Sequence, residues 1–550
     1  MKLANIITAK AILMIVILAT CCSCTDFLTR DHPTGVTDDN FWKTMNECES
    51  ALGQCKLWPH GTYHYTDPNI SLVHMEGMTD NEYFFSNYET QVVNLGNGSA
   101  TPTTGGYISK VWKAYYKYIR RCNRFLEHVG SAYFTQETER ERMIAEVKVW
   151  RAWYHMQLLL WYGRNDGIPI VETALEASEI YQPRNTVQEC LDFINKELDE
   201  VISITDDAIC PFLWDEGNRA RMSRSSALVL KMDLNLQFKQ YDLAQNAAKQ
   251  IIDSGVFELY HSTASDDDPG KNFRDLFRYV GEQNKERIMF TDNGLNEFWF
   301  RCMGTPLGGQ GTCAVLKSLV DEFETADGKT LNMLSADLRS KLEKEPLSQG
   351  RDPRLFATVM LPEDSATLYN YTYTPFDESS SDYIGKTGAS RSGYMLKKFL
   401  DERDRASHFG SLDYMLYRYA EVLLDYVECL VETGDWQNPE VEKYINMIRN
   451  RAGMPNMDKS VYNTQEKVRE LYRRERRVEL AFEGKRYNDI RRWNIGKETM
   501  NGPIYGAWNP QEQSFVTIEN RICTFPKNDS WPLPQAEVTA NSNIKQPTGW

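Results

Sequence analysis

Apolar residues recur at intervals of three and four positions in two long stretches of the chain, 109–254 and 413–493. This spacing is typical of amphipathic helices, which bury one face against a neighbour. The predicted helices cover residues 111–126, 135–162, 187–198, 223–238, 243–254, 414–433, 439–451 and 465–483. Stacked helical pairs of about 34 residues are the unit of tetratricopeptide-type scaffolds. We therefore expect a mostly α-helical protein with a tetratricopeptide-like scaffold of helical pairs.

The segment between the two helical stretches lacks this periodicity. It is rich in Gly, Pro, Ser, Asp and aromatic residues, for example at 266–270, 308–311 and 369–383. This composition favours turns and loops, so we predict a large loop-rich insertion in the helical scaffold. The expected organisation is a signal over 1–23, a loop-rich segment over 24–108, helical pairs over 109–260, a loop-rich ligand-binding insertion over 261–412, and helical pairs with a closing segment over 413–550.

Residues 1–24 combine a basic start, an apolar core from Ala11 to Ala19 and a cysteine cluster that ends at Cys24. The apolar core is too short to span a bilayer as a helix, so we interpret it as an export signal. Ser23 suits cleavage that leaves Cys24 as a lipidated N-terminus, although Cys21 is a rival position and an ordinary secretory signal is an alternative. A multiply acylated cysteine would anchor the protein to a membrane surface.

The net charge of the chain argues against one class of binding partner, nucleic acids. Among 550 residues, 77 are acidic and 62 are basic, which gives a formal net charge of −15. Nucleic-acid binding depends on clustered Lys and Arg, so we expect no nucleic-acid partner. Aromatic residues make up 12% of the chain. Because aromatic rings serve cores and binding surfaces alike, we expect most of them in the helical core and the remainder in loops.

Cysteine and histidine spacing does not indicate a metal site. Nine of the twelve cysteines lie beyond Cys24, and they form no CxxC motif. Export permits disulfides, and the nearest candidate pairs are Cys48 with Cys55 and Cys302 with Cys313. His60, His64 and His74 share an aromatic segment without a framing ligand motif, which favours surface or packing roles. We expect no metal and no cofactor.

Three carboxylates near the end of the last predicted helix could suggest an enzyme. Glu475, Glu479 and Glu483 share one helical face, but several arginines occupy the same stretch. Arginine lowers the pKa of a neighbouring carboxyl group, whereas a glycosidase needs a proton donor with a raised pKa. We therefore predict structural ion pairs here. The sequence also contains no G-x-S-x-G elbow and no phosphate-binding G-K-S/T loop, and we expect no catalytic residues.

Two loop segments, 78–98 and 293–301, combine aromatic rings with amide, carboxylate and guanidinium groups. Sugars present apolar C–H faces and a belt of hydroxyl groups, which flat rings and polar side chains can hold together. The candidate glycan-binding residues are Asp80, Asn81, Tyr83, Phe85, Tyr88, Asn97, Phe298, Trp299 and Arg301. For any one of these aromatic residues, burial in the core explains the sequence equally well.

Several motifs occur in an order that resembles a known family. They are CTDFL at 24–28, GIPI at 167–170, RNT at 184–186, NFRDLF at 272–277, RYAEVLL at 418–424, NMIRNRAG at 446–453, ERRVELAFEGKR at 475–486 and WPLP at 531–534. With these motifs the chain resembles the SusD/RagB outer-membrane lipoproteins of Bacteroidetes nutrient-uptake systems. The resemblance implies a SusD-like fold, no catalytic activity, and a lipid anchor at Cys24 on the exterior face of the outer membrane.

The resemblance also implies a function. The protein would capture an oligosaccharide and deliver it to a SusC-like TonB-dependent transporter, over which it would act as a lid. One alternative is a RagB-like protein that binds peptides, whose cavity would offer backbone-pairing groups in place of stacked rings. A surface glycosidase is the second alternative.

Overall fold

The computed structural model describes residues 41–62, 71–85, 90–348 and 350–550. The predicted signal, the proposed lipid site Cys24, and the candidates Tyr88 and His64 lie outside the described residues. Within the described part of the chain, none of the helices is both long enough and apolar enough to cross a bilayer.

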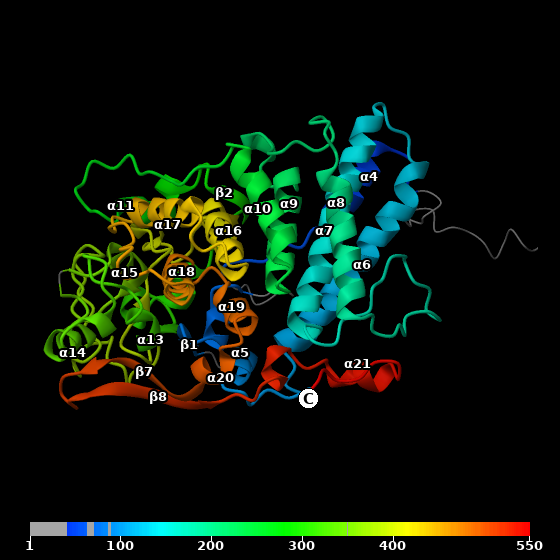
Figure 1. Ribbon diagram of the computed structural model, residues 1–550. Coiled ribbons are helices and arrows are strands. Elements are labelled where there is room, and N and C mark those ends of the chain that lie inside the picture. Colours follow the sequence, from blue (N-terminus) through cyan, green and yellow to red (C-terminus); the bar gives the residue numbers. More distant parts are fainter. Residues whose placement is uncertain (1–40, 63–70, 86–89, 349) are drawn as a thin grey trace, which may run out of the picture.

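Long helices stack in chain order on one side of the molecule, at the right and centre of Figure 1. Helix α6 (Tyr107–His128) packs on α7 (Glu137–Tyr162), and α7 packs on α8 (Val187–Ile202). Helix α8 contacts α9 (Arg224–Gln237), which forms a pair with α10 (Tyr241–Asp253). The predicted scaffold of helical pairs is confirmed.

The C-terminal helices continue the same stack. Helix α16 (Tyr419–Glu432) packs against α10 and also contacts α17 (Pro439–Arg451) and α18 (Gln465–Glu479). The long loop-rich segment between α10 and α16 is therefore an insertion into one helical scaffold, because the helices on either side of it are neighbours in space.

Local sequence signals explain where helix α8 begins. The Thr186 hydroxyl accepts a hydrogen bond from the Glu189 amide at 3.2 Å, and the Glu189 carboxylate accepts one from the Thr186 amide at 2.7 Å. This capping box satisfies two amides that have no partner inside the helix. Just upstream, Gly167 adopts φ +72°, and a Cβ there would meet the Asn185 carbonyl oxygen at 1.9 Å, so the turn requires glycine.

Several helix boundaries differ from the prediction, and two of these differences have a clear structural cause. Residues 414–418, predicted as helix, form strand β6 (Tyr414–Arg418), which pairs antiparallel with β2 (Arg287–Thr291). All five residues of β6 are buried, and a short apolar run fits a buried strand as well as a helix, so the partner strand decides. Helix α18 ends at Glu479 instead of residue 483, and Phe482 then adopts φ +63°, which a right-handed helix cannot include.

The insertion consists of loops with short helices and strands, shown at the left of Figure 1. Its elements are α11 (Lys271–Leu276), α12 (Phe298–Cys302), β3 (Cys313–Val315), α13 (Lys317–Val320), α14 (Ala336–Lys344), α15 (Pro353–Thr358), β4 (Val359–Met360) and β5 (Met395–Leu396). Strand β1 (Glu82–Phe84) joins them in an antiparallel sheet with the order β1-β3-β5-β4. This sheet attaches the N-terminal segment to the insertion.

The remaining elements come from the N-terminal and C-terminal parts of the chain. They are α4 (Met45–Cys55), α5 (Thr90–Gly96), α19 (Arg486–Arg492), α20 (Gly496–Thr499), β7 (Asn501–Asn509), β8 (Ser514–Ile522) and α21 (Gln535–Ala540). Strands β7 and β8 form a hairpin along the lower edge of the molecule in Figure 1. Helix α21 lies near the foot of the helical stack in the same view.

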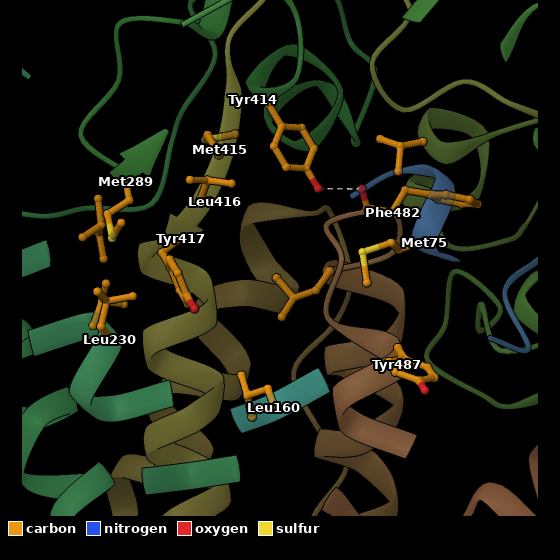
Figure 2. Close-up of a cluster of buried hydrophobic side chains, with 14 of the residues drawn as sticks. Met75, Leu160, Leu230, Met289, Tyr414, Met415, Leu416, Tyr417, Phe482 and Tyr487 are labelled. Carbon is orange, nitrogen blue, oxygen red and sulfur yellow. Dashed lines mark hydrogen bonds between the residues drawn. The ribbon is translucent and has the colours of Figure 1, made fainter. Parts of the chain in front are cut away.

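One large cluster of buried side chains runs through the stack and the insertion. Figure 2 shows part of it, where side chains of strand β6 lie near Leu160 of α7 and Leu230 of α9. The Tyr414 hydroxyl donates a hydrogen bond to the Phe482 carbonyl oxygen at 3.2 Å. Because strand β6 contributes to this shared core, the scaffold and the insertion pack as one hydrophobic unit.

A buried ionic network, centred on Glu479, crosses this core. The Glu479 carboxylate pairs with Arg354 of α15 at 3.1 Å and with Arg418 of β6 at 2.8 Å, and it also accepts a hydrogen bond from Arg451 of α17. Burial raises the pKa of Glu479, but the three guanidinium groups outweigh burial and hold its pKa well below the ordinary value.

Glu475 and Glu483, the other two carboxylates of the predicted helical face, also form buried ion pairs. Glu475 pairs with Arg449 at 3.1 Å, and Glu483 pairs with Arg418 at 2.7 Å and with Lys398 at 2.6 Å. Burial again acts to raise the pKa of both groups, and the neighbouring cations lower it overall. The predicted structural ion pairing is confirmed, with partners that come from distant segments.

Replacing Glu479 with glutamine tests the network. We expect Glu479→Gln to lower the free energy of unfolding by about 3–5 kcal/mol, because three buried guanidinium groups would lose their common counter-charge. Urea denaturation followed by circular dichroism measures the change. Glu258→Gln is the matched control: Glu258 pairs with Lys285 at the surface, where the two side chains are 65% and 67% exposed, and it should change stability by less than about 0.5 kcal/mol. Equal effects of the two substitutions would contradict a stabilising role for the network.

Candidate functional site

The two loop segments predicted to bind a ligand meet at the edge of the small sheet. The Phe85 amide donates a hydrogen bond to the Thr312 carbonyl oxygen at 2.9 Å, and the Thr312 amide donates to the Arg301 carbonyl oxygen at 3.1 Å. Tyr83 lies opposite Ala314 in the β1–β3 pair. Strand pairing therefore brings Tyr83 and Phe85 next to the segment that carries Arg301.

We define the aromatic surface as a set of partly or largely exposed residues at this junction. Its members are Tyr83, Phe85, Phe300, Arg301, Gln310, Arg391 and Phe409. The rings of Phe300 and Phe409 stack with centroids 5.5 Å apart and an interplanar angle of 23°, and Phe409 is 50% exposed. The Arg391 guanidinium lies 4.2 Å from the centroid of the Phe85 ring. Flat rings and cationic groups thus lie together at the surface.

Hydrogen bonds hold Arg301 in place beside these rings. Its Nε donates to the buried Glu297 carboxylate at 2.8 Å, and its Nη1 donates to the Gln310 side-chain oxygen at 3.1 Å. The guanidinium carbon lies 5.5 Å from the centroid of the Phe300 ring. A positioned guanidinium at the edge of an aromatic platform can donate hydrogen bonds to hydroxyl groups of a ligand that stacks on the platform.

The return of the chain after α12 depends on close backbone packing. The Gln310 amide donates to the Phe300 carbonyl oxygen at 2.9 Å, and the Gly311 amide donates to the Met303 carbonyl oxygen at 2.8 Å. Gly311 adopts φ +61°, and a Cβ at this position would meet the Gly388 carbonyl oxygen at 2.4 Å. The glycine-rich composition of this loop therefore has a structural cause, because a side chain would prevent the approach.

Phe298 and Trp299 lie in the core. Trp299 is 1% exposed, and its indole Nε1 donates a hydrogen bond to the Leu307 carbonyl oxygen at 2.6 Å. Phe298 is also buried and contacts Phe399 edge-on, with ring centroids 5.7 Å apart. Neither ring presents a face to solvent in this structure, whereas their neighbour Phe300 does.

Asp80 and Asn81 are also buried. Asp80 pairs with Arg477 at 3.0 Å and with Arg486 at 2.8 Å, while Asn81 bonds Arg477 and the Glu76 carboxylate, both at 2.9 Å. Burial raises the pKa of Asp80, but the two arginines outweigh it and lower the pKa overall. These contacts fasten the segment before β1 to α18 and to α19.

Asn97 stabilises a turn next to the hairpin. Its side-chain oxygen accepts hydrogen bonds from the Ser99 amide at 3.1 Å and from the Ser99 hydroxyl at 2.7 Å. Its carbonyl oxygen accepts one from the Ile522 amide at 3.2 Å. Of the described candidates, the structure thus brings together Tyr83, Phe85 and Arg301, and it ties Asn97 into a turn.

The structure adds surface residues that the sequence analysis did not select. Phe300 lies within a predicted segment, but sequence does not tell which of three consecutive aromatic residues faces outward. Phe409 lies in a polar loop far along the chain. The Phe300 amide donates a hydrogen bond to the carbonyl oxygen of the preceding residue, His408, at 3.2 Å, which holds the two loops side by side. An isolated aromatic residue within the polar run 401–411 was the available signal for Phe409.

Comparison with protein families identifies the fold. A model of the SusD family matches residues 270–550, and a model described as "Starch-binding associating with outer membrane" matches residues 27–212. The chain belongs to the SusD family. Among its relatives, the SusD-like proteins P38 and P25 of Formosa agariphila are each 23% identical to it, over 97% and 98% of this chain and 97% of each relative.

Solved SusD-like structures share the architecture. A SusD-like protein from Bacteroides fragilis superposes with a TM-score of 0.78 at 25% identity, covering 94% of this chain and 99% of that protein. A SusD-like carbohydrate binding protein from the same organism gives the same TM-score and identity over 92% and 100%. Surface glycan-binding protein A from Bacteroides thetaiotaomicron gives a TM-score of 0.65 at 19% identity over 92% and 100%. The predicted SusD-like fold class is confirmed.

Substitution of Trp299 tests the assignment of this residue to the core. We expect Trp299→Ala to lower the free energy of unfolding by about 3–5 kcal/mol, because it would leave a large cavity. Chemical denaturation measures the loss. Phe409→Ala is the matched control, since its half-exposed ring should contribute about 1 kcal/mol or less. A Trp299→Ala protein of wild-type stability would show that the ring is not a core element.

Proposed function

We propose that this protein is a non-catalytic, glycan-binding surface lipoprotein that captures an oligosaccharide and delivers it to a SusC-like TonB-dependent transporter. The observation that carries the proposal is the aromatic surface, where exposed stacked rings lie beside a positioned guanidinium group. The printed names of the structural neighbours, which include carbohydrate-binding and surface glycan-binding proteins, support this ligand class.

The geometry suits reversible capture of a sugar chain. The Phe300–Phe409 stack offers an apolar platform for the C–H face of a sugar ring, and Arg301, Gln310 and Arg391 offer hydrogen bonds to its hydroxyl groups. Each such contact contributes little by itself. Several weak contacts allow binding while leaving the ligand free to pass onward to a transporter.

The electrostatics of the carboxylates support a binding protein over a glycosidase. Glycoside hydrolysis needs a carboxylic acid with a raised pKa beside a second carboxylate. Glu475, Glu479 and Glu483 instead have lowered pKa values inside the ionic network. These three groups therefore suit ion pairing and are unsuited to donating a proton to a leaving group.

A binding screen followed by substitution tests the ligand class. The purified protein is screened against plant, host and microbial glycan arrays and a matched peptide library, and the best ligand is then measured by calorimetry. We expect Phe409→Ala to weaken glycan binding by about 2- to 10-fold, because loss of one stacking ring removes roughly 0.5–1.5 kcal/mol.

Tyr133→Ala is the control for this experiment, because Tyr133 is 75% exposed and lies outside the aromatic surface. Its glycan affinity should equal that of the wild type. Binding of peptides alone would replace the proposal with a RagB-like peptide carrier. Shortened glycan products in the same samples would identify a glycosidase.

Cell fractionation tests the proposed membrane anchor. We expect Cys24→Ala to move the protein from the outer-membrane fraction to the soluble fraction, since the new N-terminus would carry no lipid. Cys21→Ala is the matched control and should leave the protein in the outer membrane, where external protease can digest it. Retention of the Cys24→Ala protein together with release of the Cys21→Ala protein would assign the lipid to Cys21.

A further inference from the structure

Three potential metal ligands meet in the core directly behind the aromatic surface. His74 comes from the 3₁₀ helix η1 (His74–Met78), Cys302 ends α12, and Cys313 begins β3. One ligand atom from each residue lies within 4.8 Å of those of the other two, and all three side chains are fully buried. A Cys₂His set of this kind is typical of zinc sites.

The buried carboxyl group of Glu82 lies beside Cys313, just outside the group of three ligand atoms. In the β1–β3 pair, Glu82 lies opposite Val315 and Phe84 lies opposite Cys313, so the side chains of Glu82 and Cys313 emerge on one face of the sheet. Glu82 is fully buried, and no N–H or O–H donor among the described residues satisfies its carboxyl oxygens. Burial raises the pKa of Glu82, and the neighbouring Cys313 raises it further. The Cys313 thiol is therefore the polar neighbour of this carboxyl group.

The separation of the two sulfur atoms favours a metal over a disulfide. Cys302 Sγ and Cys313 Sγ lie 3.3 Å apart. Two sulfur ligands of a tetrahedral zinc ion lie about 3.8 Å apart, given Zn–S bonds of about 2.3 Å. A disulfide needs about 2.05 Å. Zinc binding would therefore change the Sγ–Sγ distance by about 0.5 Å, whereas disulfide formation would shorten it by about 1.2 Å.

We propose that His74, Cys302 and Cys313 form a binding site for a thiophilic divalent cation, with zinc as the best match. Glu82, on the same face of the sheet as Cys313, would move in as the fourth ligand. The site is independent of what the aromatic surface binds. The ligand set is of the closed, structural kind, because four protein groups fill a tetrahedral coordination sphere and leave no position for substrate.

The protonation states of the cluster suit metal binding with release of protons. Burial lowers the pKa of His74 to about 3, with a contribution from the charge of Arg301, so its imidazole is neutral at physiological pH. Burial raises the pKa of the Cys313 thiol, and its contact with Cys302 raises it further. Cysteine binds a metal ion as a thiolate, so metal affinity at a site with thiol ligands should fall as pH decreases.

The charge of the occupied site would be offset only in part, because the nearby Arg301 also pairs with Glu297 at 2.8 Å. A divalent cation with two thiolates and one carboxylate leaves one negative charge, and the guanidinium group of Arg301 is close enough to affect the pKa of His74. Cys302 directly follows Arg301, and Cys313 directly follows Thr312, which receives the hydrogen bond from the Phe85 amide. A cation at this position would therefore fix the base of the aromatic surface by joining η1, β1, α12 and β3.

Metal loading of the full chain tests the site. The reduced protein is stripped with a chelator, given one equivalent of Zn²⁺, and separated from free metal before elemental analysis. We expect one zinc ion per chain and, after loading with Co²⁺, a thiolate-to-cobalt charge-transfer band with tetrahedral d–d bands. Cys302→Ala and Cys313→Ala should each weaken Zn²⁺ binding at least about tenfold. Cys429→Ala, at a fully buried cysteine outside the cluster, should bind as the wild type does.

X-ray absorption of the zinc-loaded wild-type protein gives a second measurement that needs no variant. It should show two sulfur ligands at about 2.3 Å and two nitrogen or oxygen ligands at about 2.0–2.2 Å. Failure of the reduced protein to retain zinc would overturn the proposal. So would zinc retention by both cluster variants, or a Cys302–Cys313 disulfide, detected by peptide mapping, in protein isolated without reductant.

Discussion

The pairing of Glu479 with Arg354, Arg418 and Arg451 is the constraint on which the rest of the structure depends. The four residues come from α18, α15, β6 and α17, so one carboxylate connects the helical stack to the insertion. A buried charge is costly when it has no partner. The charges of this network are therefore all paired only when the four segments lie together. The ionic network thus defines how the loop-rich part is oriented on the scaffold, while the shared hydrophobic core supplies most of the burial.

The aromatic surface is built on this fixed base. Asp80 and Asn81 tie the segment before β1 to α18 and α19, and β1 then pairs with β3 in the insertion. The exposed rings consequently project from backbone that is held by ion pairs and strand pairing. Such rigid support lets a few side chains present a defined platform, which lowers the entropy lost when a ligand binds.

Local patterns in the sequence predicted the helices because helical periodicity is itself local. The capping box at Thr186 and the ends of α7 and α17 follow directly from it. Strand β6 was mistaken for helix because its pairing with β2 is a long-range event. Likewise, the two predicted segments contain Tyr83, Phe85, Phe300 and Arg301, but the sequence could not tell that Phe300 faces outward and Trp299 inward. It also gave no sign that Gln310, Arg391 and Phe409 would join them. His74 approaches Cys302 only through the folding of distant segments, so ligand spacing along the chain gave no sign of their cluster.

The position of Glu479 near the end of the chain has a consequence for the order of assembly. Arg354 and Arg418 each pair with a carboxylate that precedes them in the chain, Asp352 and Glu286, but the contact that joins both to one group is made by Glu479. Contacts between segments so far apart in sequence slow the search for the native state. The joint contact of the insertion and the helical stack is therefore complete only when the last fifth of the chain is in place.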